Sequence, residues 1–523
     1  MENSGYKVVS NRSDQRKKFL IAFVSFAFTL AFVIAVFSLT LGRRTVDWMD
    51  GTAGYSRAAA FPYPFISGSS LYVLRNDRSY DEIDNNVKNA VFDPAVDSVY
   101  YVYEPTSELY EYSVGDKTRV KLCSGVDSFS LFKNRTHVAF STESGDICVY
   151  SYNSKSVSVL RGGGSGGSVP ADGSLFYVGV SSIFYFDDFD AEGGTATLKQ
   201  WKMSGSVSTV SESVLYSSGV TIWKNDEAVS FYTKSGLSIC PKDGSPVVIG
   251  ENFAQVLPGA YDHPDICGDV VRSFDTCVPV RYLSCTDPDK GLSLYSVSVS
   301  SGKVKFSPIC EGVKEIVGYD DASEVIVFTA DKNGSDLSVF KSQKGGKAQE
   351  LFLTEADSEL FFEPSSHCVY ITSKDDSCTR VDIYDKAKTK YLVSNDAKDL
   401  TAYFRKPFAV FSDSAETTKT IVINRNIRES YSISETRLYG KSDSVYLLLR
   451  GNGISDRVSL DYASSGVLKR ISGDCFGESV VFDKKLENVI YYSGGALYVF
   501  TGDQNYKVGT FAEKTVPVPV CTY

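Results

Sequence analysis

One unit recurs about ten times along this 523-residue chain: a short apolar or aromatic strand, a turn of Asp, Ser, Gly or Asn, and further strands separated by similar turns. Residues 99–122 show the unit, with Val-Tyr-Tyr-Val-Tyr at 99–103, Leu-Tyr-Glu-Tyr at 109–112 and Arg-Val-Lys-Leu at 119–122. Apolar and polar residues alternate in many of these segments, which is typical of strands with one buried face. The sequence therefore predicts repeated units of antiparallel strands.

The spacing of the units indicates the fold class. Leading strands are expected to begin near Val99, Val138, Leu175, Val229, Val278, Val325, Val369, Ala409, Val445 and Val489. Several strands within a period of about 40 to 50 residues are typical of β-propeller blades. We expect an all-β chain whose residues 66–523 form a β-propeller of about 7–10 blades, as one continuous ring or, alternatively, as two subrings.

The two ends of the predicted propeller contain candidates for closing the ring. Residues 70–74 (Ser-Leu-Tyr-Val-Leu) are expected to supply a strand beside the last blade near residues 506–508. Such pairing would remove exposed sheet edges. No long amphipathic helical pattern follows residue 42, so no catalytic α/β domain is expected.

An apolar segment precedes the repeats. Residues 19–42 carry no charge and only Ser and Thr as polar side chains. A helix of this length measures about 36 Å, enough to cross a hydrocarbon core of about 30 Å. The sequence predicts a tail at 1–18, a transmembrane signal anchor at 19–42 and a stalk at 43–65. A cleaved signal peptide is the alternative.

The basic residues around this segment predict its orientation. A cluster of four lies shortly before it, at Arg12, Arg16, Lys17 and Lys18, and two lie directly after it, at Arg43 and Arg44. Because the more basic flank stays in the cytoplasm, we expect a cytoplasmic N-terminus and an extracytoplasmic propeller at the cell membrane. The inverted topology is the alternative.

Charge and cysteine usage limit the partners and the chemistry. The formal net charge is −10, which disfavours nucleic acid because its binders present basic faces. The eleven cysteines show no CxxC spacing, so a zinc ribbon is not expected. Most should be buried free thiols, although an oxidising compartment would allow one or two disulfides.

The unit at residues 99–122 resembles the repeats of bacterial TolB-like and WD40-like propeller proteins. The resemblance covers roughly residues 66–511, but no repeat has the Gly-His and Trp-Asp pairs of true WD40 blades. It implies binding or scaffolding. An anchor followed by a propeller is also similar to dipeptidyl-peptidase-type proteins, yet this sequence shows no hydrolase domain after the last repeat.

One acidic segment is a candidate cation site. Asp188, Asp190 and Glu192, followed by Gly193, approximate the first half of a calcium loop, in which alternate oxygens converge on the ion. Position twelve of that loop would be Lys199 instead of a bidentate Glu. A calcium site and a solvated hairpin loop are therefore the two interpretations.

The motifs of catalysis are weak in this chain. Residues 163–167 read Gly-Gly-Ser-Gly-Gly, which formally satisfies G-x-S-x-G but lies in a Gly-rich run instead of a strand–turn–helix context. The three histidines, at 137, 263 and 367, form no HExxH pattern. No catalytic residue and no organic cofactor are expected.

These observations lead to one functional hypothesis and one alternative. The chain is expected to be a membrane-anchored extracytoplasmic propeller that binds a protein or an envelope polymer as a scaffold, without enzymatic activity. The alternative is a propeller enzyme that acts on glycans or peptides at the envelope, which would need convergent carboxylates in a central pocket.

Overall fold

The computed structural model describes most of the repeat region. Described are residues 61–94, 96–132, 134–163, 176–257, 277–278, 280–320, 323–331, 336–363, 367–383, 390–402, 408–412, 419–423, 426–431, 436–442, 445–450, 457–464, 467–482 and 487–519. Backbone contacts divide the chain into two compact units, Met1–Trp48 and Met49–Tyr523, and every described residue belongs to the second. The predicted tail and membrane segment lie outside the described residues. Within the described ranges, no helix is long and apolar enough to cross a membrane.

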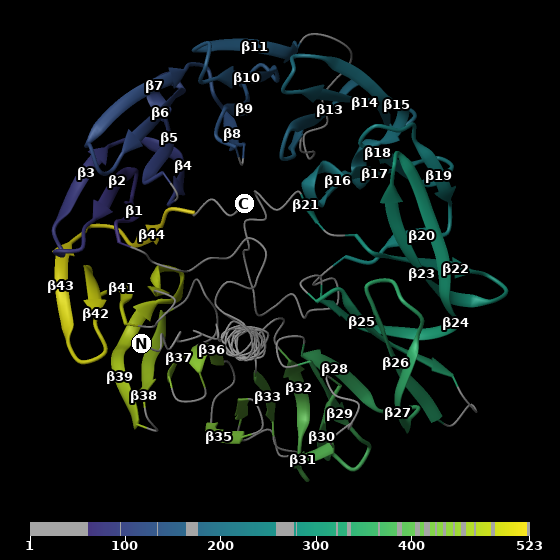
Figure 1. The fold of residues 1–523 in the computed structure, drawn as a ribbon. Coiled ribbons are helices and arrows are strands. Elements are labelled where there is room, and N and C mark those ends of the chain that lie inside the picture. The colour runs from purple at the N-terminus through teal and green to yellow at the C-terminus, as the bar shows by residue number, and fades with distance from the viewer. Residues whose placement is uncertain are drawn as a thin grey trace, which may run out of the picture. The chain divides into compact units, whose positions relative to one another are not determined.

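The described regular structure is almost entirely β. Nine sheets follow one another along the chain, and seven of them have four strands (Figure 1). Their strand pairs are antiparallel, apart from the parallel pair of β16 and β21. The first sheet, in the order β3-β2-β1-β44, contains β1 (Tyr63–Ser67), β2 (Ser70–Leu74), β3 (Tyr80–Asp84) and β44 (Thr515–Pro517). The next two contain β4 (Val87–Asp93), β5 (Ser98–Tyr103), β6 (Glu108–Ser113) and β7 (Thr118–Cys123), then β8 (Ser128–Leu131), β9 (His137–Ser141), β10 (Ile147–Ser151) and β11 (Ser156–Arg161).

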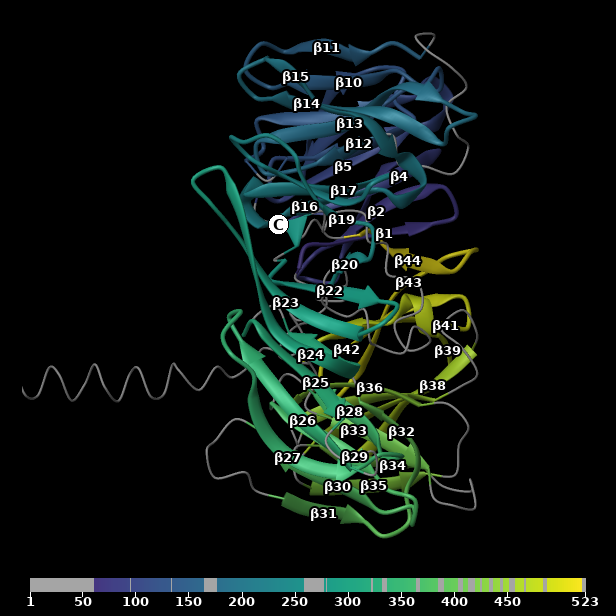
Figure 2. The ribbon, with the colours of Figure 1, turned by 90° about the vertical axis from the view of Figure 1, so that its right-hand side faces the viewer.

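Two larger sheets each combine two repeat units. The nine-stranded sheet contains β12 (Phe176–Val178), β13 (Ser182–Asp190), β14 (Thr195–Lys202), β15 (Val207–Leu215), β16 (Val220–Trp223), β17 (Ala228–Thr233), β18 (Gly236–Pro241), β19 (Val247–Gly250) and β21 (Cys277–Val278). The seven-stranded sheet contains β20 (Phe253–Gln255), β22 (Tyr282–Asp287), β23 (Gly291–Ser300), β24 (Lys303–Asp320), β25 (Val325–Asp331), β26 (Asp336–Gln343) and β27 (Gln349–Glu355). The 18-residue β24 pairs with β23 through its first part and with β25 through its second (Figure 2).

Four further sheets of four strands complete the series. They are β28 (Glu359–Glu363), β29 (Cys368–Thr372), β30 (Cys378–Asp382) and β31 (Lys390–Ser394); β32 (Lys398–Ala402), β33 (Phe408–Ser412), β34 (Lys419–Ile423) and β35 (Asn426–Tyr431); β36 (Thr436–Ser442), β37 (Val445–Arg450), β38 (Arg457–Ser464) and β39 (Val467–Phe476); and β40 (Val481–Phe482), β41 (Val489–Ser493), β42 (Ala496–Phe500) and β43 (Asn505–Thr510). The helical segments among the described residues are four 3₁₀ turns, η1 (Glu104–Thr106), η2 (Tyr216–Ser218), η3 (Lys224–Asp226) and η4 (Gly477–Ser479).

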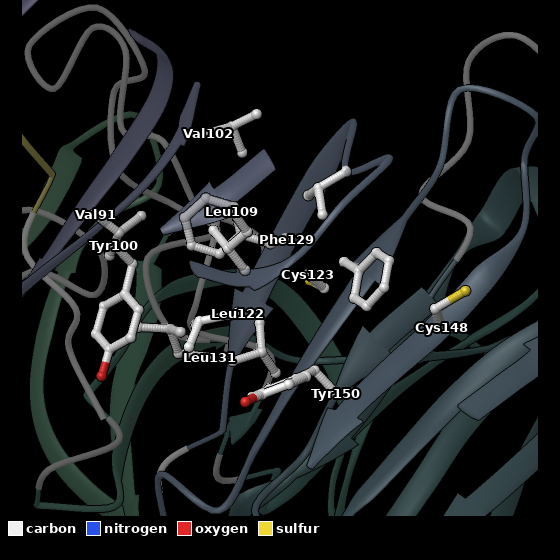
Figure 3. Close-up of a cluster of buried hydrophobic side chains, with 13 residues drawn as sticks. Val91, Tyr100, Val102, Leu109, Leu122, Cys123, Phe129, Leu131, Cys148 and Tyr150 are labelled. Atoms are coloured by element: carbon white, nitrogen blue, oxygen red, sulfur yellow. The ribbon is translucent and has the colours of Figure 1, made fainter. Parts of the chain in front are cut away.

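Buried apolar clusters lie between neighbouring sheets. Between β4–β7 and β8–β11, one cluster contains Val102, Leu122 and Tyr100 together with Cys148 and Tyr150 (Figure 3). Equivalent clusters join β8–β11 to β12–β15, β28–β31 to β24–β27, and β36–β39 to β40–β43. Because successive sheets pack face to face through these clusters, the all-β fold is propeller-like.

The first sheet contains strands from both ends of the described chain. In it, β1 pairs with β44 through Phe65–Pro517, Ile66–Val516 and Ser67–Thr515. A further apolar cluster joins this sheet to β40–β43. Residues 70–74, predicted to close the ring against the last blade near residues 506–508, do pack against that blade through Leu74 and Tyr72. They pair with β1 and β3, however, and not with β43, which is the edge of its own sheet.

Most predicted leading strands are the second strands of their sheets. The starts predicted near Val99, Val138, Val229, Val325 and Val489 lie in or at the beginning of β5, β9, β17, β25 and β41. Two other starts coincide with strands at a different place in the sheet: Leu175 directly precedes β12, the first strand of its repeat unit, and Val278 lies in β21, which pairs with β16. The first strand of each sheet has a less regular alternation of apolar and polar residues than the second. The sequence pattern therefore located the second strands more readily than the first strands.

Candidate functional site

The turn between the first and second strands of a sheet has the same backbone feature in several sheets. Asp97, Arg135, Asp226, Glu324 and His367 all have positive φ, between 49° and 56°. Positive φ is uncommon for residues other than glycine. We call these segments the first turns; their described residues are 96–97, 134–136, 179–181, 224–227, 323–324 and 367.

Polar contacts link the first turns to neighbouring repeat units. The guanidinium of Arg135 donates to Asp93 of the preceding sheet, with Nε–Oδ2 at 2.5 Å and Nη2–Oδ1 at 3.1 Å. The carboxylate of Asp226 accepts from the backbone N–H groups of Val180 at 2.8 Å and Ser181 at 2.7 Å. Because Asp93 and Asp226 are buried, these contacts satisfy charges that would otherwise be costly to remove from water.

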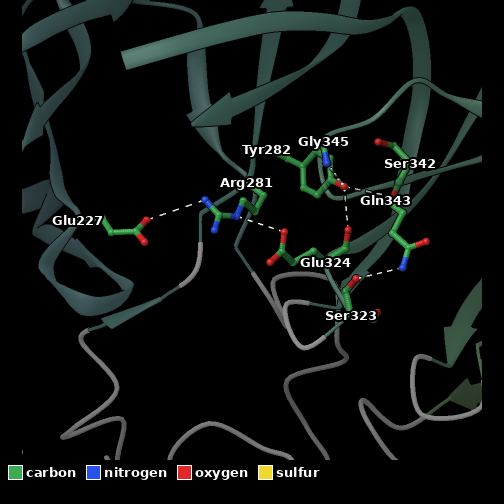
Figure 4. A network of polar contacts seen from close by, with 8 residues as sticks. All are labelled: Glu227, Arg281, Tyr282, Ser323, Glu324, Ser342, Gln343 and Gly345. Atoms are coloured by element: carbon green, nitrogen blue, oxygen red, sulfur yellow. Dashed lines mark hydrogen bonds and ion pairs between the residues drawn. The ribbon is translucent and has the colours of Figure 1, made fainter. Parts of the chain in front are cut away.

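Arg281 connects two first turns by charge (Figure 4). Its guanidinium lies 3.9 Å from Glu227 Oε2, in the turn before β17, and 3.3 Å from Glu324 Oε2, in the turn before β25. All three side chains are partly exposed, so solvent weakens the attraction. The two ion pairs therefore align the turn before β17 with the turn before β25, and they contribute little to the free energy of unfolding.

The hydroxyl of Tyr282 is a second link in the same network. It donates toward the carbonyl oxygens of Glu324 at 2.9 Å and Ser342 at 3.2 Å, and it accepts from the N–H of Gly345 at 3.1 Å. Burial is the main cause that raises the pKa of this hydroxyl. Tyr282 therefore fixes the β26–β27 turn against β22 (Figure 4).

Removing this hydroxyl tests that role. A Tyr282→Phe variant is expected to lose about 1–2 kcal/mol of unfolding free energy, because a buried N–H and two carbonyl oxygens lose a partner. Amide hydrogen exchange should show faster exchange at Gly345 than in the wild type. An unchanged exchange rate at Gly345 would contradict the assignment, and Tyr80→Phe, at a half-exposed ring, is the matched control.

Exposed apolar side chains collect on the outermost strands. Of the twelve large apolar side chains that are exposed among the described residues, eleven lie on the last strand of a repeat unit. They are Tyr80, Val120, Val157, Val159, Val207, Val247, Val248, Phe306, Leu353, Leu392 and Val467. We call this set the outer rim. Its members are single residues on separate strands, except on β11 and β19.

Within the outer rim, strand β11 has two exposed apolar side chains and no charged residue between positions 156 and 160. Residues 156–160 read Ser-Val-Ser-Val-Leu, and Val157 and Val159 are 44% and 63% exposed. Their partners across the strand pair are Tyr150 and Cys148, which face the sheet β4–β7. Because β11 is the edge of its sheet, one row of its backbone N–H and C=O groups is open to another strand.

The residues of the predicted calcium loop lie at the β13–β14 hairpin. Asp188 and Asp190 end β13, and Glu192 lies in the turn. Asp190 Oδ1 accepts from the N–H of Gly193 at 3.0 Å, and Lys199 Nζ lies 2.6 Å from Asp187 Oδ2. No three His, Cys, Asp or Glu side chains that could hold a metal ion gather anywhere in the described part of the chain. The geometry lends the calcium prediction no support, because Lys199 already neutralises this end of the hairpin.

The other candidate residues have structural surroundings or lie outside the described residues. The imidazole of His137 contacts the rings of Phe132 and Trp201, with centroids at 5.9 and 5.4 Å. Burial lowers the pKa of His137, as expected for a histidine packed among rings. Ser165 and His263 lie outside the described residues, and His367 lies in a first turn.

The described cysteines agree with the prediction of buried thiols. All eight whose side chains are described are free, and six are buried. Cys267, Cys277 and Cys521 have no described side chain. Burial raises the pKa of Cys123, Cys378 and Cys475 to about 12, and that of Cys148 to about 11.

These thiols predict a loss of stability at alkaline pH. Below pH 9 the thiols are neutral in both the folded and the unfolded chain, so their contribution to stability is fully present. Between pH 9 and 12 only the unfolded chain ionises, and stability falls as the pH rises. Urea unfolding at pH 8 and pH 10.5 should show this fall, with a shallower dependence for Cys475→Ala. Identical pH dependence in the variant and the wild type would refute the explanation.

Comparison with known proteins gives no family for this chain. No protein-family model matches it, and no curated protein matches it. Among solved structures, a eukaryotic initiation factor aligns with 87% of this chain and 98% of its own, at 9% identity and a TM-score of 0.37. The tricorn protease aligns at 10% identity and a TM-score of 0.23, and PorZ, a surface component of the type-IX secretion system of Porphyromonas gingivalis, at 11% and 0.24.

The extent of these alignments differs between the proteins. They cover 87% of this chain for the tricorn protease and 82% for PorZ, but only 62% and 52% of those proteins themselves. At these TM-scores the alignments carry no argument about this chain. The chain is thus described as an all-β, propeller-like fold. This description follows from the order and packing of the chain's own sheets.

Proposed function

We propose that the chain is a membrane-anchored scaffold whose propeller-like region lies outside the cytoplasm and binds a protein or an envelope polymer. The observation that carries this proposal is the outer rim, where eleven exposed apolar side chains lie on outermost strands. An exposed strand edge with apolar side chains is a template for pairing with another chain. Binding through the rim needs no catalytic residue.

The edge of β11 is the clearest place for such binding. An extended segment that pairs with β11 would gain backbone hydrogen bonds, and its alternate side chains would contact Val157 and Val159. Val120 of β7, which is 54% exposed, belongs to the sheet that packs against this face of β11. No charged side chain lies between Lys155 and Arg161 to oppose the approach of a strand.

Site-specific crosslinking in the native membrane tests the scaffold proposal. A photoreactive amino acid at Val159 of the full-length chain is expected to crosslink one reproducible protein, identified by mass spectrometry. The same probe at Lys507, an exposed position on β43, is the control. The crosslink should disappear when Val157 is replaced by lysine. Equal products from Val159 and Lys507, or a product insensitive to Val157→Lys, would contradict binding at β11.

The orientation in the membrane is tested separately. In intact cells, a membrane-impermeant maleimide is expected to label Lys234→Cys, at an exposed turn, but not Ser4→Cys in the predicted tail. After permeabilisation both should react. The reverse pattern would indicate the inverted topology. The buried native thiols make a low background, because burial keeps them protonated.

A further inference from the structure

Two segments far apart in the sequence are rich in lysine and contain no acidic residue. Residues 290–310 include Lys290, Lys303 and Lys305, and residues 337–349 include three further lysines, with no Asp or Glu in either segment. At the average of 64 acidic residues in 523, segments of this combined length would hold about four. This is unusual in a chain with a net charge of −10.

The first segment forms a face of the β23–β24 hairpin that carries lysine and serine. Across the strand pair, Ser298 lies opposite Lys305, and Ser300 lies opposite Lys303. Directly paired residues of antiparallel strands point to the same side of the sheet. All four residues are exposed. The two lysines are two positions apart on β24, which places them about 7 Å apart along the strand.

The second segment lies against the same side of this hairpin. The N–H of Gly345 donates to the hydroxyl of Tyr282 at 3.1 Å, and Tyr282 pairs with Ser296 of β23 (Figure 4). A Cβ atom on Gly345 would lie only 2.9 Å from Cβ of Ser296. Lys344 and Lys347, both exposed in this turn, are therefore held beside the face of β23 that carries the serines.

The four lysines form no ion pair with a carboxylate in the part of the chain that the structure describes. Among the ion pairs of the described residues, none involves Lys303, Lys305, Lys344 or Lys347. Two acidic residues lie nearby: Glu324, whose carboxylate pairs with Arg281 at 3.3 Å, and Asp243, whose turn packs against Gly302 beside Lys303 without an ion pair to that lysine. The fold thus gathers four uncompensated positive charges and several hydroxyl groups, which we call the lysine–serine face (residues 298–307 with 344–347).

We propose that the lysine–serine face binds a linear, phosphate-bearing polymer of the cell envelope. Lysine acts as a point charge toward phosphate, and serine hydroxyls can donate to phosphate oxygens. Charge complementarity favours a polyanion, because this face is basic in an acidic protein. The inference rests on the proposed function, since it specifies the polymer that the scaffold binds.

Binding of labelled polyphosphate to the detergent-solubilised full-length chain tests the proposal. Fluorescence anisotropy with end-labelled linear inorganic polyphosphate compares the wild type with Lys303→Glu/Lys305→Glu and with Lys344→Glu/Lys347→Glu. Each pair is expected to weaken binding by about tenfold or more. The control Lys234→Glu/Lys507→Glu makes the same change in net charge at exposed lysines elsewhere and should alter binding by less than about twofold.

Three results would overturn the inference. The wild type fails to bind polyphosphate at low salt; the control pair weakens binding as much as the two test pairs; or vesicles with phosphatidylserine bind through the same lysines more tightly than polyphosphate, which would assign the face to the membrane surface. Lys→Gln versions of both pairs, with unchanged thermal unfolding, exclude misfolding as a cause. Crosslinking at Val159 is independent of these lysines, so its persistence would show that only this inference fails.

Discussion

Replacing Phe65 with alanine is expected to lower the free energy of unfolding by about 3–5 kcal/mol, the range for removal of a fully buried aromatic ring. The side chain of Phe65 is completely buried. Its ring stacks on Tyr72, with centroids at 5.2 Å, and meets Phe511 edge to face at 5.3 Å. The change therefore opens a cavity between the first sheet and β40–β43. Urea unfolding followed by tryptophan fluorescence measures the loss.

The control for this prediction is an exposed rim residue. Val467 is 67% exposed on β39, so Val467→Ala should change the unfolding free energy by less than about 0.5 kcal/mol. Phe65→Leu, which refills part of the volume, should recover some of the stability. If Phe65→Ala and Val467→Ala cost the same, the contact of the first and last sheets does not contribute to stability.

Replacing Asp226 with alanine is expected to cost about 3 kcal/mol or more, because it leaves several buried donors without an acceptor. Its carboxylate accepts from the N–H groups of Val180 and Ser181, and from the hydroxyls of Ser181 at 2.9 Å and Ser182 at 3.1 Å. Amide hydrogen exchange at Val180 and Ser181 should accelerate strongly, while amides of β4–β7 change little.

The isosteric variant separates charge from shape in this contact. Asp226→Asn keeps one acceptor oxygen and should lie between the wild type and Asp226→Ala in both stability and exchange. Asp243→Ala, at an exposed turn residue, is the control and should be nearly neutral. Unchanged exchange at Val180 in Asp226→Ala would show that the link between the two turns is unimportant.

The part of the fold that repeats could be predicted from the sequence. Segments such as Val99–Val102 and Val489–Tyr492 combine β-branched and aromatic residues with turn residues on each side, and they are strands in the structure. The turn between β41 and β42 contains Gly494 and Gly495, and both have the positive φ that such hairpin turns require. Local signals sufficed because the strands pair with their neighbours along the chain.

The merging of repeat units could not be predicted in this way. β24 runs through Gly312, which has a φ of 68°, where a strand break would be expected from sequence. The strand continues because β23 pairs with its first part and β25 with its second. Pairing over such distances depends on tertiary packing, which local propensity does not contain.

For the candidate sites too, residue types and spacing could be taken from the sequence, but contacts between distant segments could not. The acidic hairpin at Asp188 and Asp190 looked like a cation site from spacing alone, but the pairing of Lys199 with Asp187 depends on the β13–β14 register. The lysine–serine face was missed because its two segments are about forty residues apart in sequence. A search for acid-free, lysine-containing segments would have found each segment, but not their contact.

The pairing of β1 with β44 also sets an order of events in folding. Ile66 pairs with Val516, so the contact closes a loop of about 450 residues, at an entropic cost of about 5 kcal/mol before any contact is gained. The edge of β1 therefore stays open until β44 docks, and in that interval its unpaired backbone N–H and C=O groups are a target for a chaperone that binds extended segments.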